Sequence, residues 1–113
     1  MKNDKTLNNL VDEIKARLLE HHVVVAIISS KIALELSCEM LFNLSSSLKL
    51  SGGAVRDYSK RLWDARVLID KYCEEIRSGN FQPSLPEEIE IMKGIESFAN
   101  TIGELGIIYA GNL

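Results

Sequence analysis

The sequence has few of the residues that interrupt regular structure. Its 113 residues include only seven glycines and two prolines, too few for an all-β chain that turns about every ten residues. Two cysteines do not make a disulfide-dense secreted miniprotein. With 46% apolar residues the chain is too hydrophobic to remain disordered. These shortages point to one globular domain of ordinary composition.

Long apolar runs and an excess of basic residues are also missing. The most apolar stretch, 23–28, has six residues, whereas a membrane span needs about 20, and the first residues do not form a signal peptide. The net charge of −3 argues against a broad face for nucleic acid. Cys38 and Cys73 lie in apolar segments and form no Cys-x-x-Cys pair. We therefore expect no membrane or nucleic-acid partner, and free thiols in a reducing compartment, the cytoplasm.

The segment 54–77 has the clearest helical pattern. Its apolar residues recur at alternating spacings of three and four: Val55, Tyr58, Leu62, Ala65, Ile69, Tyr72 and Ile76. This heptad spacing predicts one buried face. The other faces carry four oppositely charged pairs at i,i+4: Asp57–Arg61, Lys60–Asp64, Arg66–Asp70 and Lys71–Glu75. Gly79 follows where a left-handed helix end needs it, and we expect Leu62 and Ile69 to be almost fully buried.

The last segment begins with a capping box. Ser84 can bind a free amide of the first turn, and Glu87, three residues later, can return the bond. Apolar residues then recur at spacings of four and three: Ile91, Ile95, Phe98, Ile102, Leu105 and Tyr109. This pattern predicts a second helix, with Ile95, Phe98 and Ile102 in the core.

The first half of the chain leaves two arrangements open. No glycine or proline lies between Asp4 and Leu50, so either two helices meet near 20–23 or one helix runs through. A single helix of about 45 residues would be about 68 Å long and would have to protrude into a partner subunit. The charged residues of 31–39 fall on one narrow stripe: Lys31, Glu35 and Glu39. A helix with so narrow a polar stripe is covered on most sides, which predicts a homodimer or larger assembly.

A stripe of small residues runs beside the last apolar seam. Its members are Ala99, Gly103, Gly106 and Ala110, again at spacings of four, three and four. Glycine inside a helix costs roughly 1 kcal/mol relative to alanine, so we interpret this face as a close contact with the central helix or with a second subunit. The alternative is that the helix frays near Gly103. Trp63 lies beside the first seam, and is either an exposed partner anchor or part of a second core face.

One short motif suggests catalysis. Arg17 and His22 are separated by four residues, a spacing that resembles the signature of the HEPN family, small all-α proteins that include dimeric ribonucleases. The resemblance covers six residues. It implies that the arginine and the histidine meet across a dimer and cleave RNA without metal, with Arg17 stabilising phosphate charge and His22 acting as acid or base.

Taken together, these patterns predict one all-α domain over 1–113. We expect a three- or four-helix antiparallel bundle with a long N-terminal helical region. The predicted function is a non-catalytic protein–protein interaction or assembly module that self-associates as a homodimer. Its expected partner-binding residues are Ala99, Gly103, Gly106, Ala110 and Trp63. We expect no metal and no cofactor. The alternative is the HEPN-like ribonuclease that uses Arg17 and His22.

Overall fold

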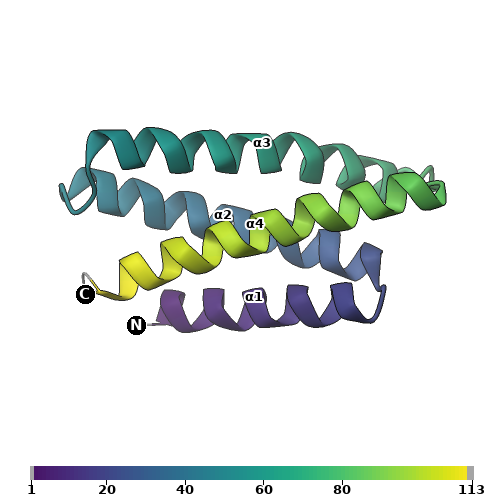
Figure 1. Cartoon of the computed structure of the whole chain (residues 1–113), viewed down its shortest axis with the longest axis horizontal. Coiled ribbons are helices and arrows are strands. Elements are labelled where there is room, and N and C mark those ends of the chain that lie inside the picture. The colour runs from purple at the N-terminus through teal and green to yellow at the C-terminus, as the bar shows by residue number, and fades with distance from the viewer. Residues whose placement is uncertain (1, 112–113) are drawn as a thin grey trace.

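Four helices make up most of the chain. The computed structural model describes the backbone of residues 2–111 and the side chains of residues 7–111. Its helices are α1 (Lys2–Leu19), α2 (Val23–Ser46), α3 (Gly52–Arg77) and α4 (Leu85–Gly111). Helices that follow one another in sequence run in opposite directions (Figure 1). The predicted all-α antiparallel bundle is therefore confirmed, with four helices.

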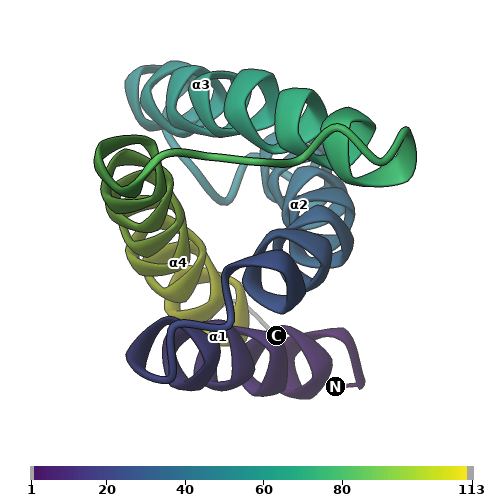
Figure 2. The same cartoon turned by 90° about the vertical axis from the view of Figure 1, so that its right-hand side faces the viewer.

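The four helices do not occupy equivalent positions. α1 and α3 lie on opposite sides of the bundle, and α2 and α4 cross between them (Figures 1 and 2). α2 and α4 each pack against all three other helices, whereas α1 and α3, over residues 2–111, do not touch each other. The core is therefore centred on the crossing of α2 and α4.

The N-terminal region is two helices and not one. α1 ends at Leu19 and α2 begins at Val23, at the position where the sequence allowed a bend. The long axis of the molecule measures 43 Å, well short of the roughly 68 Å that a continuous helix would need. Folding back lets α1 cover one side of α2 and α4.

The two apolar seams form the core as predicted. Ile69, Ile95 and Ile102 are 0% exposed, and Leu62 and Phe98 are 3% exposed. The helices that carry the seams also begin as the sequence indicates. The Ser51 hydroxyl accepts a hydrogen bond from the Ala54 amide, and the Ser84 hydroxyl accepts one from the Glu87 amide. The Glu87 carboxylate in turn accepts from the Ser84 amide, which completes the capping box.

Three of the helices end in the same left-handed turn. The turn residues are His21, Leu48 and Gly79, with φ angles of 59°, 57° and 78°. After each, an amide bonds to the carbonyl five residues back: His22 to Arg17, Lys49 to Leu44 and Asn80 to Glu75. This is the Schellman arrangement, in which glycine is the usual residue. Only the Gly79 end was predicted, because histidine and leucine rarely adopt this conformation.

A buried line of small residues runs along α2. Its members are Ala26, Ser30, Ala33 and Ser37, all 0% exposed. The two serine hydroxyls donate to the carbonyl oxygens of Ala26 and Ala33, at 2.7 and 2.6 Å. No polar hydrogen is therefore left unsatisfied on this line, and the small side chains allow neighbouring helices to approach α2 closely.

Candidate interaction surface on α2 and α3

The outer face of α2 is largely apolar. Residues spaced by four and three along the helix share one side, and on the outer side these are Ile28, Ile32, Glu35, Glu39 and Phe42, all exposed. The opposite side of α2 is buried in the core. α2 thus differs from an ordinary surface helix, which turns a polar face to water.

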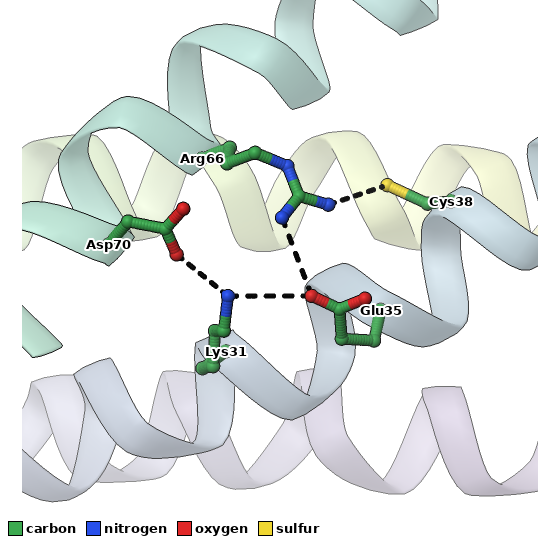
Figure 3. A network of polar contacts seen from close by, with 5 residues as sticks. All are labelled: Lys31, Glu35, Cys38, Arg66 and Asp70. Atoms are coloured by element: carbon green, nitrogen blue, oxygen red, sulfur yellow. Dashed lines mark hydrogen bonds and ion pairs between the residues drawn. The ribbon is translucent and has the colours of Figure 1, made fainter.

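A network of charges joins α2 to α3 (Figure 3). Lys31 Nζ lies 2.7 Å from Asp70 Oδ1 and 3.4 Å from Glu35 Oε1. Arg66 completes it: Nη1 lies 3.5 Å from the same Glu35 oxygen, and Nη2 donates to Cys38 Sγ at 3.5 Å. Lys31 and Glu35, two members of the predicted polar stripe, thus contact α3, while Glu35 also remains exposed.

The same network explains a difference from the predicted charge pairs of α3. Asp57–Arg61 and Lys60–Asp64 form at 2.9 and 3.1 Å. Arg66 and Asp70, predicted to pair with each other along α3, bond instead to residues of α2. The spacing within one helix could not reveal these partners, because they lie 31 and 39 residues away in sequence.

The network is electrically balanced. The hydrogen bond to Asp70 raises the pKa of Lys31 above its usual value. The hydrogen bond to Cys38 raises the pKa of Arg66, the guanidinium that also faces Glu35. Across the junction of the helices, two cations, Lys31 and Arg66, face two acids, Glu35 and Asp70, so the four charges of the network sum to zero. Exposed ion pairs of this kind stabilise a fold by only about 0–1 kcal/mol each. Their main effect here is to fix the position of α2 relative to α3.

A cavity of about 350 Å³ lies beside the network, between α2 and α3. Cys38, Leu41 and Phe42 line it from α2, and Leu62, Trp63 and Arg66 line it from α3. Phe42 and Trp63 are 66% and 64% exposed. Trp63, which the sequence left as an anchor or a core residue, is thus on the surface, and Phe42 stands with it at the same cavity.

The predicted small-residue stripe of α4 is divided between buried and open positions. Ala99 and Gly106 are buried, Gly103 is half-buried and Ala110 is exposed. A Cβ added at Gly106 would lie 3.6 Å from Leu7 Cδ2, whereas one added at Gly103 would meet nothing within 4 Å. Within one chain the stripe is therefore not one continuous contact, and its contact with a second subunit stays a prediction. The neighbour of Gly106 is α1, and not the central helix, because α1 folds back beside the C-terminal half of α4. The helix continues to Gly111.

The closest approach at a glycine is at a position that the sequence did not single out. A Cβ on Gly94 would lie 2.7 Å from Leu68 Cδ1, a distance that real side chains do not tolerate without movement. Gly94 therefore lets α4 approach Leu68 of α3. It stands apart from the stripe at 99–110, so spacing within α4 contained no signal for it.

Arg17 and His22 lie at the turn between α1 and α2, joined through one carboxylate. Glu20 Oε1 lies 3.1 Å from Arg17 Nη1 and 4.0 Å from His22 Nδ1. Glu13 also faces Arg17, at 4.0 Å from Nε. The structure brings the two motif residues together within one chain, and it surrounds the guanidinium with acids.

The described part of the chain contains no cluster of three or more His, Cys, Asp or Glu side chains that could hold a metal ion. Of the four described helices, none is long and apolar enough to cross a membrane. Comparisons with protein-family models, with curated proteins and with solved structures gave no match to this chain. The argument for function therefore depends on the α2–α3 surface itself.

Proposed function

We propose that this chain is a non-catalytic protein–protein interaction or assembly module that associates with itself. One observation carries the proposal: Ile28, Ile32 and Phe42 stand exposed on α2, although the opposite side of this helix is already buried. Burying such side chains is the main favourable term in protein association. A contiguous exposed apolar patch on a small protein is typical of an interaction site, whereas apolar side chains scattered singly over a surface are not.

The titratable groups support a structural role for the charges. Lys31 owes its raised pKa chiefly to its bond with Asp70, and Glu87 owes its lowered pKa to the capping bonds with Ser84. Both shifts favour the ordinary charged form of the group. A catalytic acid or base needs the reverse, a pKa moved toward the working pH. These charges hold helices together and cap them.

Sedimentation equilibrium over a micromolar concentration range tests the proposal. We expect a mass of two chains at the upper end of the range and a concentration-dependent fall toward one chain on dilution. A mass of one chain at every concentration contradicts self-association.

We place the module in the cytoplasm. Cys38 and Cys73 are free thiols, and a reducing compartment preserves that state. For Cys73, burial raises the pKa of the thiol and so makes the reactive thiolate scarcer. Thiol quantification on protein isolated from its cell under alkylating conditions should find both cysteines reduced, and an oxidised pool would argue for another compartment.

A metal-independent ribonuclease is the second candidate. It is favoured by the shared contact of Arg17 and His22 with Glu20 Oε1, because a carboxylate beside a histidine can orient the ring for proton transfer. RNA cleavage by the intact chain, lost in both Arg17→Ala and His22→Ala, would favour this function. His21→Asn is the matched control, since asparagine tolerates the left-handed backbone at that neighbouring position. Absence of cleavage by the intact chain would reject it.

A further inference from the structure

The α2–α3 surface has a pattern that a second copy of the same surface can complement. Three residues on the α2 side have a counterpart on the α3 side at the same height along the helix axes. Lys31 is level with Asp70 and Glu35 with Arg66, as their ion pairs show. Phe42 is level with Trp63, since both line one cavity. Along the groove, every cation thus stands beside an acid, and one aromatic stands beside another.

A two-fold axis that runs along the groove exchanges the α2 side of one copy with the α3 side of the other. Because the rotation keeps the level of each residue, Lys31 then faces Asp70 of the other copy. Glu35 likewise faces Arg66, and Phe42 faces Trp63. The charges that balance each other within one chain also balance between two chains. A surface with a large excess of one sign would repel its own copy. The four charges of the network sum to zero, and exposed Glu39 adds one further acid to this face.

We propose that two copies of this chain dock face to face through α2 and α3 about such an axis, with Phe42 and Trp63 of each copy closing the cavity of the other. The contact is isologous, so each subunit contributes the same patch. The proposal rests on the self-association inferred above and specifies its surface.

The exposed apolar area matches what such a dimer needs. Five large side chains of this face are between 46% and 66% exposed: Ile28, Ile32, Phe42, Trp63 and Val67. At on the order of 200 Å² for each aromatic side chain, Phe42 and Trp63 offer about 260 Å², and the three aliphatic side chains add to this area. A standard interface buries about 800 Å² on each partner, a little over half of it apolar. Aromatic residues at its centre are also the usual energetic anchors.

Trp63 is the single tryptophan of the chain, so its fluorescence reports directly on the proposed contact. We expect its emission to move to longer wavelength on dilution, in step with the fall in mass seen by sedimentation. Phe42→Glu should raise the dimer dissociation constant at least about tenfold and leave Trp63 emission at the long-wavelength position at all concentrations. Circular dichroism should show that the variant keeps its helices.

Ile107→Glu is the matched control. Ile107 is 74% exposed on α4. The substitution therefore introduces the same charge as Phe42→Glu, at an exposed apolar residue outside the proposed contact. We expect it to leave the dissociation constant and the fluorescence shift unchanged. Dimers that form without a change in Trp63 emission, or that Ile107→Glu weakens and Phe42→Glu does not, would overturn the proposed surface while self-association stands. A chain that is monomeric throughout overturns both.

Disulfide trapping tests the axis itself. In a background of Cys38→Ser and Cys73→Ser, one chain receives Ser45→Cys and another Ser59→Cys, at positions that line the cavity from α2 and from α3. The axis along the groove predicts efficient cross-linking in the mixture and little in either chain alone. Preferential cross-linking of Ser45→Cys chains with each other would place α2 on α2 and overturn the proposed arrangement.

Discussion

α2 and α4 carry lines of small residues with the same spacing but bury them to different extents. In α2 the line is completely enclosed: Ala26, Ser30, Ala33 and Ser37 are all 0% exposed. In α4 only Ala99 and Gly106 are buried, whereas Gly103 is partly open and Ala110 is exposed. A spacing of four, three and four places residues on one side of any helix. The paths of neighbouring helices decide how much of that side is covered.

The comparison shows why a stripe of small residues does not by itself identify an interface. The stripe of α4, the first candidate from the sequence, is partly occupied by α1 of the same chain. The outer side of α2 was harder to recognise, because the sequence showed only a narrow polar stripe among many apolar residues. That excess of apolar residues, and not the glycines, is the feature that supports association.

Truncation of the α4 seam should have the largest effect. Phe98, 3% exposed, is a core residue beside the small-residue stripe of the same helix. Phe98→Ala should lower the free energy of unfolding by about 3–5 kcal/mol, through lost burial and the cavity that remains. Urea denaturation measures this, with Ile107→Ala as the exposed control on the same helix, expected to change stability by no more than about 0.5 kcal/mol. Equal midpoints for the two variants would contradict the placement of the seam.

A larger side chain in the buried line of small residues on α2 should have the next largest effect on stability. Ser37 is fully buried and its hydroxyl is bonded to the Ala33 carbonyl. Ser37→Leu should destabilise the fold by about 1–3 kcal/mol, because the added carbons have no space. Ser46→Leu, at the exposed end of α2, is the control. A thermal melt in which both variants resemble the parent would show that the α2 line is not tightly packed.

Alanine substitutions at the glycines of α4 should have the smallest effect on stability. They distinguish a packed glycine from an open one. Gly103→Ala should stabilise the chain by about 0.5–1 kcal/mol, since the new methyl group meets nothing and the unfolded chain loses freedom. Gly94→Ala should gain less, because its Cβ would displace Leu68. Chemical denaturation of the two variants side by side measures the difference. A larger gain at Gly94 than at Gly103 would reverse the assignment of which glycine is packed.

Much of the fold was predictable because its determinants are local. Heptad spacing located the seams through Leu62, Ile69 and Phe98, and the serine–glutamate spacing located the start of α4. The C-terminal ends of α1 and α2 could not be predicted from the sequence, because no glycine marks them. His21 and Leu48 adopt a conformation that glycine prefers, at a cost of about 1–2 kcal/mol each. The hydrogen bonds that close these turns come from the neighbouring residues His22 and Lys49. The site was predictable only in part: Trp63 was a candidate, whereas Phe42 and the charge network were not.

The sequence alone determined the all-α class, the buried seams of the last two helices and the absence of a long apolar span, because these follow from residue periodicity over one or two helical turns. It left open whether the first half of the chain forms one helix or two. Only the tertiary structure decided which helices cross at the centre, that α1 covers Gly106, and that Arg66 and Asp70 reach α2. Those outcomes depend on pairs of residues far apart in the chain, such as Lys31 and Asp70, 39 positions apart. Periodicity within a helix specifies a face, but the neighbour of that face is selected by how all four helices pack together.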